Sequence, residues 1–217
     1  SHRISATVLF VLVAVTTYLA WKSRQEFSIT YYASVTALGL VLVAAILGGV
    51  TVLTELSWWV VIIHLSVAEM VVASMVVASV SGWRVYHSKL NGFPRPESPK
   101  PLRIFVLIAL VSTFGLILFG SYMTVRGYGS VCGTWPLCMG GILPVGEAFT
   151  IHMVHRISAL LVGVLVFSLF LLVFLDRMKN PGVFWEVGLV AGLFLTQVLI
   201  GAIMVWMDFS LLVKSIH

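Results

Sequence analysis

Charged residues are scarce in this 217-residue chain, and their scarcity sets its class. Asp, Glu, Lys and Arg make up 10% of the residues and hydrophobic residues 60%, whereas about a quarter of a soluble domain is charged. A soluble fold could not bury so much apolar surface, so soluble enzymes and soluble binding modules are excluded. The net charge of +5 is dispersed over short loops, so nucleic acid is not an expected partner.

Cysteine is almost absent as well, with Cys132 and Cys138 the only two. Neither of them, and no Asp or Glu, accompanies the histidines at metal-ligand spacing, which argues against a zinc site of four protein ligands. Alternating polar and apolar stretches are also missing. Because the apolar runs are continuous, a transmembrane β-barrel is excluded.

The chain instead has six apolar runs of about 20 residues, the length of a membrane-spanning helix. A seventh begins near Leu211 and stops at His217. The pattern predicts an all-α polytopic membrane protein that contacts the lipid bilayer. The six runs cover 4–21, 30–53, 58–80, 103–125, 151–175 and 183–207.

Basic residues indicate the orientation. Nine of the thirteen Lys and Arg residues lie in alternate loops, at 22–24, 84–103 and 177–179, as the positive-inside rule expects of cytoplasmic loops. The histidine-bearing ends of the spans then face the outer side. The predicted location is the bacterial cell membrane, which we favour over the mitochondrial inner membrane.

An internal duplication organises the chain. The sequence His-Arg-Ile-Ser-Ala occurs at 2–6 and again at 155–159, an offset of 155 − 2 = 153 residues. Aligning 2–64 with 155–217 at that offset gives 19 identities in 63 positions, and it places His64 on His217. Self-similarity at a fixed offset indicates repeated structural units, and each copy carries two histidines.

The duplication predicts the domain organisation. An N-terminal half covers 1–81, a cytoplasmic linker with four of the seven prolines covers 82–102, and a C-terminal half covers 103–217. The first copy has no counterpart of 103–150. We therefore expect two pseudo-symmetric four-helix bundle halves in a longer parent protein, with the first helix and most of the last outside this chain.

The paired histidines point to haem. His2, His64, His155 and His217 all lie near the outer ends of spans, and each pair sits on helices that run in the same direction. A single buried histidine is more often bonded to a carbonyl, but two pairs at one spacing indicate function. Two facing imidazoles fit axial ligation of haem iron, because the porphyrin supplies the other four nitrogens.

Other polar residues near these histidines leave two interpretations open. Arg3 and Arg156 follow their histidines directly, so each either binds a haem propionate or extends to the interface with no ligand. His152 lies on the His155 face, as a supporting group or a simple polar residue at the helix entrance. Glu69 lies inside the third span, where a proton-relay role stays open.

Cys132 and Cys138 share one outer loop. That face is oxidising, so a disulfide is favoured, and it would hold the loop as a lid over the second copy. A redox-active pair is the alternative.

At these residues the chain resembles the haem A synthases. The similar features are the repeated His-Arg-Ile-Ser-Ala, Gly-Gly-Val-Thr-Val-Leu-Thr at 48–54 before Ile-His-Leu at 63–65, and Cys-Gly-Thr-Trp-Pro-Leu-Cys at 132–138. The last has one residue more before Trp than the family's Cys-x-x-Trp-Pro-x-Cys. A family carboxylate three residues before the first histidine would precede residue 1.

The resemblance implies the role of each half. In the C-terminal half His155 and His217 would be the axial ligands of a haem b cofactor. In the N-terminal half His2 and His64 would be catalytic and would line the site where haem O, the substrate, is oxidised from a methyl to a formyl group to give haem A for cytochrome oxidase. A haem O synthase is the implied source of substrate.

A two-haem membrane cytochrome that only relays electrons is the competing hypothesis. The placement of both pairs near one face favours the oxidoreductase, because a transmembrane relay needs haems at both faces. A non-catalytic haem-binding assembly protein is a third reading. The electron acceptor and the oligomeric state, a homo-oligomer included, stay open.

Overall fold

The computed structural model describes all residues except 1, 92–99, 143–144, 176–180, 211–212 and 214–217. The described part of the chain contains no β-strand. It consists of long helices and one short 3₁₀ helix: α1 (His2–Lys22), α2 (Ser28–Leu53), α3 (Trp58–Asn91), α4 (Lys100–Val125), η1 (Tyr128–Ser130), α5 (Glu147–Leu175) and α6 (Pro181–Trp206).

Among the described residues, six helices are long and apolar enough to cross a membrane, as the six apolar runs predict. Most of their large apolar side chains are exposed, as expected of helices whose surfaces meet lipid rather than water. The chain is therefore a multi-pass integral membrane protein. The expected seventh run falls on residues that the structure describes only at Val213.

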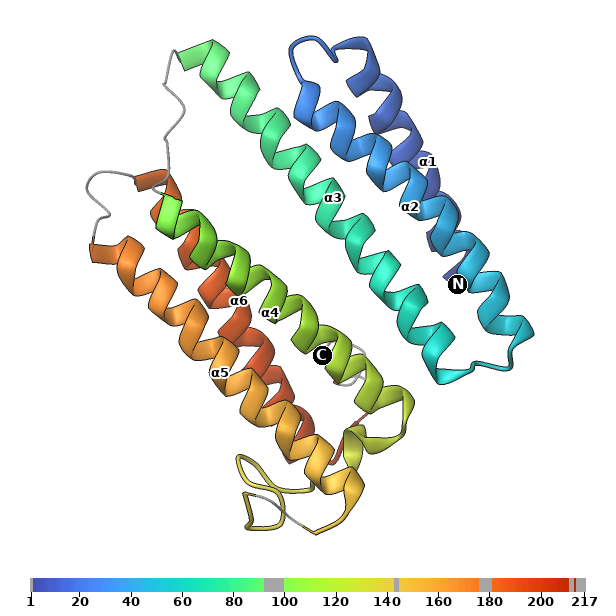
Figure 1. Ribbon diagram of the computed structural model, residues 1–217, viewed down its shortest axis with the longest axis vertical. Coiled ribbons are helices and arrows are strands. Elements are labelled where there is room, and N and C mark those ends of the chain that lie inside the picture. The colour runs from blue at the N-terminus through green and yellow to red at the C-terminus, as the bar shows by residue number, and fades with distance from the viewer. Residues whose placement is uncertain (1, 92–99, 143–144, 176–180, 211–212, 214–217) are drawn as a thin grey trace. The chain divides into compact units, whose positions relative to one another are not determined.

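The chain forms two compact units, Ser1–Arg95 and Pro96–His217. In the first, short turns make α2 antiparallel to both α1 and α3, so α1 and α3 begin at the same end (Figure 1). Its core joins Val13, Ala37, Val41 and Val71 from the three helices. The Thr17 hydroxyl of α1 donates a hydrogen bond to the Ser34 carbonyl of α2, 3.0 Å away.

Helix α3 is longer than the apolar run that predicts it. Residues 82–91 are helical rather than part of the linker expected at 82–102. No proline interrupts the chain before Pro94, and Lys89 at the end of α3 pairs with Glu26 of the α1–α2 turn at 2.5 Å. Helix α3 therefore reaches the α1–α2 turn. The boundaries of the functional halves stay a prediction.

In the second unit, α5 packs against both α4 and α6. Val162, Val166 and Ala191 form its buried core, with Leu116 and Phe194 packed around them. Gly163 permits the close approach of α6, because a Cβ atom there would lie 3.1 Å from Phe194 Cε1.

The duplication is visible in the backbone. Helix α2 and helix α6 have the same length of 26 residues, and their bounds differ by 153 at each end. Each ends in a turn with two successive left-handed residues that are not glycine: Glu55 and Leu56 (φ 50° and 63°), and Asp208 and Phe209 (φ 50° and 56°). Such φ values are strained for bulky residues.

The hydrogen bonds of the two turns repeat as well. The Leu56 N–H donates to the Thr51 carbonyl at 2.9 Å, and the Phe209 N–H donates to the Met204 carbonyl at 2.8 Å. The sequence repeat is therefore also a structural repeat across these turns.

Candidate functional site

In the first unit, His64 lies on the second turn of α3 with its ring against α2. The ring is half-buried, and the position of a Cβ on Gly48 would be 3.4 Å from His64 Cε1 and 3.8 Å from Nδ1. Nδ1 is buried and has no hydrogen-bond partner among the described residues. His2 is exposed at the start of α1, at the end of the unit where α3 begins, and no described contact joins the two imidazoles.

In the second unit, His155 lies on α5 with its ring against α4. A Cβ on Gly120 would be 3.1 Å from His155 Cε1, and the Phe119 ring centroid is 5.9 Å from that of the imidazole. His217, the predicted second ligand, lies outside the described residues. Of the predicted ligand pair, the structure therefore describes His155 alone.

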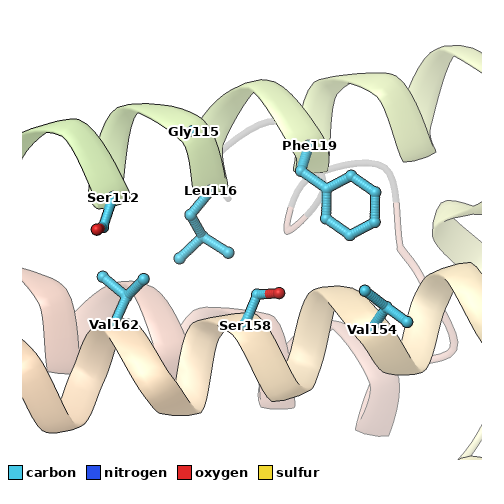
Figure 2. Close-up of a pocket in the computed structure, with 7 residues that line it drawn as sticks. All are labelled: Ser112, Gly115, Leu116, Phe119, Val154, Ser158 and Val162. Carbon is cyan, nitrogen blue, oxygen red and sulfur yellow. The ribbon is translucent and has the colours of Figure 1, made fainter.

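An apolar groove of about 360 Å³ lies between α4 and α5 beside this histidine. Figure 2 shows Leu116 and Phe119 projecting from α4 toward Val154, Ser158 and Val162 of α5. Phe119 links the groove to His155 through the ring contact described above. The groove is thus lined by aromatic and aliphatic side chains, and Ser112 and Ser158 supply its polar groups.

The predicted disulfide between Cys132 and Cys138 is present. Both cysteines are fully buried against Met153 of α5. Thiol exchange requires attack on an accessible sulfur, so the burial favours a structural bridge over the redox-active alternative. Thr134 Oγ1 of the ring accepts a hydrogen bond from the N–H of Met139, the residue after the ring, at 2.8 Å.

Arg156 holds this ring on α5. Its Nη1 donates to the carbonyls of Thr134 (2.6 Å) and Pro136 (3.1 Å), and its Nη2 donates to the carbonyl of Cys132 (3.3 Å). These bonds are a third use that neither sequence interpretation anticipates. Arg3, its repeat counterpart, is exposed, and binding of a propionate by either arginine stays a prediction.

His152 and Tyr128 fasten the start of the loop. His152 is 4% exposed, and its Nδ1 donates to the Tyr128 carbonyl at 3.0 Å. The Tyr128 hydroxyl accepts from Arg126 and donates to Glu147, both at 3.3 Å, and the first of these bonds raises the pKa of Arg126. His152 therefore anchors the loop, and no sequence pattern marks Tyr128 as its partner.

Trp135 completes the attachment, because its ring meets the Trp206 ring edge-on at the end of α6, 5.8 Å between centroids. The loop is thus joined to α5 and to the end of α6, as the lid hypothesis requires.

The donor set fits haem better than a bare metal ion. Nowhere in the described ranges do three His, Cys, Asp or Glu side chains come together, so no such cluster forms a non-haem metal site there. His64 instead offers a half-buried imidazole whose Nδ1 faces Gly48 of α2, which leaves Nε2 for a ligand. An axial haem ligand needs one imidazole nitrogen and a flat apolar space, because the macrocycle provides the remaining ligands.

Comparison with known proteins extends over the whole chain. The COX15-CtaA family model, described as cytochrome oxidase assembly protein, matches residues 1–217. The chain is 37% identical over 73 residues to a heme A synthase of Alkalihalophilus pseudofirmus, covering 32% of this chain and 25% of that protein. It is 23% identical over 175 residues to a heme A synthase of Shouchella clausii, covering 79% of this chain and 57% of that protein.

A third similarity is to a protoheme IX farnesyltransferase of Chloroflexus aurantiacus. It is 29% identical over 110 residues, which cover 49% of this chain and 18% of that protein. The matched regions thus cover between 18% and 57% of the length of these three relatives. The two heme A synthases are bacterial, so the membrane that this chain spans is the bacterial cell membrane.

Proposed function

The chain belongs to the COX15-CtaA family of cytochrome oxidase assembly proteins, and from that premise we propose that it is part of a haem A synthase. The substrate is haem O, and the product is haem A for cytochrome oxidase. The observation that carries the proposal is the family match over the whole chain, together with relatives named heme A synthase.

The proposed reaction is the oxidation of one porphyrin methyl group to a formyl group. With water as the source of oxygen, R–CH₃ + H₂O gives R–CHO, four protons and four electrons. The enzyme is thus an oxidoreductase that passes electrons to an acceptor outside this chain. Successive hydroxylations followed by loss of water satisfy the same balance.

The N-terminal half would bind the substrate. His64, half-buried with its Nδ1–Cε1 edge toward α2, would present Nε2 to the substrate iron, and His2 would approach from α1. Both helices begin at one end of the unit, which supports this pairing. The two imidazoles would orient the porphyrin and thereby select which methyl group reacts.

The C-terminal half would hold haem b through His155 and His217. When bound, haem b supplies one-electron chemistry. The disulfide loop, fastened by Arg156 and Trp135, would cover the outer end of the half and limit access of water. A haem O synthase would supply the substrate, which the similarity to a protoheme farnesyltransferase supports.

Pigment extracted from the purified parent protein tests the proposal. We expect haem O, a hydroxylated derivative or haem A together with haem b, identified by chromatography and mass spectrometry. Two equivalents of haem b and no farnesylated haem would overturn the synthase assignment in favour of the electron-relaying cytochrome.

A further inference from the structure

His64 and His155 each lie against a glycine of a neighbouring helix. His64 of α3 faces Gly48 of α2, and His155 of α5 faces Gly120 of α4. The two contacts are not copies of one another, because the repeat equates His155 with His2 and His64 with His217. A histidine that lies against a glycine therefore occurs at two positions that the repeat does not equate.

The contact at Gly120 leaves no room for a side chain, and the contact at Gly48 leaves room for a methyl group at most. Carbon atoms in contact lie about 3.5–4.0 Å apart, whereas a Cβ on Gly120 would be 3.1 Å from His155 Cε1 and a Cβ on Gly48 would be 3.4 Å from His64 Cε1. Only glycine lets the imidazole lie directly on the helix backbone. A methyl group at Gly120 must move the ring, and one at Gly48 just touches it.

The contact also shows which nitrogen faces α2. At His64, Cε1 and Nδ1 are the atoms nearest a Cβ on Gly48, so this edge of the ring faces α2. Nε2 lies more than 4 Å from that position, so Nδ1 and not Nε2 is the nitrogen turned toward the helix. Glycine at position 48 leaves the space that this orientation of the ring requires.

Neighbouring glycines show that this is not a general property of these helices. A Cβ on Gly49, next to Gly48, or on Gly115, in the same helix as Gly120, would meet nothing within 4 Å. Close approach to an imidazole therefore distinguishes one glycine from another within α2 and within α4.

We propose that Gly48 and Gly120 are positioning residues that seat the imidazoles of His64 and His155 for haem. The proposal rests on the proposed function only in naming haem as the group that the imidazoles receive.

Alanine substitutions at these glycines test the proposal against matched controls. Gly→Ala raises helix propensity equally at each site, so the difference between G120A and G115A isolates the contact with His155. In the purified parent protein we expect G120A to retain about tenfold less haem b than G115A, since displacements below 1 Å at a site carry penalties of this size. G48A should weaken haem O binding about threefold relative to G49A, because its contact with the ring is looser than that of G120A.

A haem-free measurement separates this proposal from the function. In apo-protein, diethyl pyrocarbonate acylates unprotonated imidazoles, and peptide mapping gives the rate at each histidine. Displacement from α4 should make His155 react several-fold faster in G120A than in G115A. Resistance of the buried Cys132–Cys138 disulfide to a water-soluble phosphine is the control for folding. Equal rates and equal haem retention in the two variants would overturn the proposal. If the acylation rates of His155 differ but no haem A chemistry is found, the role of the glycine is supported and the synthase assignment fails.

Discussion

Replacing Arg156 with alanine should release the disulfide loop from α5. Arg156 makes three hydrogen bonds to carbonyls of the 132–138 ring, two of them from one nitrogen. A hydrogen bond from a charged donor contributes about 1.5–3 kcal/mol, and here the shared nitrogen and the half-exposed position reduce the sum. We estimate a loss of about 2–4 kcal/mol in the free energy of loop opening, a factor of about 30–700 in the open population.

The buried disulfide reports that population directly. Cys132 and Cys138 are both 0% exposed, so a water-soluble phosphine can reduce the bridge only when the loop opens. When reclosing is faster than reduction, the rate follows the open population. Protein in lipid nanodiscs is treated with the phosphine, quenched with a maleimide at intervals and weighed by mass spectrometry.

Two variants serve as controls for this experiment. Arg3→Ala removes the repeat-equivalent charge from the other unit and should leave the reduction rate unchanged. Arg156→Lys keeps the charge but offers a smaller set of donors. Its disulfide should therefore be reduced at a rate between those of the unsubstituted protein and Arg156→Ala. A reduction rate for Arg156→Ala within twofold of the parent would refute the assignment of Arg156 as the residue that holds the loop.

Two further predictions follow from the sites and the core. His155→Ala should abolish the haem b absorption spectrum, whereas His64→Ala should keep it and lose conversion of haem O; conversion retained in His64→Ala would contradict the substrate role. Gly163→Leu should destabilise the second unit by about 1–3 kcal/mol, the usual cost of overpacking, because a Cβ there already approaches Phe194 to 3.1 Å. Thermal unfolding followed by circular dichroism measures that loss, and an unchanged melting temperature would show that α6 can move aside.

The fold was largely predictable because its signals are local. An apolar run of about 20 residues can satisfy its backbone in a bilayer only as a helix, so the six spans follow from composition alone. The difference at α3 has the same origin. Residues 82–91 include Arg84, His87 and Lys89, so hydropathy does not count them as part of the span, although no proline interrupts the helix there.

The candidate site was predictable in residue type but not in contact. Repetition at a fixed offset picks out His64 and His155 without any structure. The partners of Arg156 depend on how the loop folds, and the glycine that faces each imidazole depends on the rotation of one helix against another. No pattern in the sequence separates Gly120 from Gly115, because both are isolated glycines in apolar surroundings.

The repeated turn after α2 and α6 has a practical consequence for protein engineering. Helices of equal length are followed by two left-handed residues and hydrogen bonds with the same spacing, so 28–57 and 181–210 correspond residue for residue. One segment can therefore replace the other with no insertion or deletion. The pigment that such an exchanged protein retains would report which haem this helix and its turn help to bind.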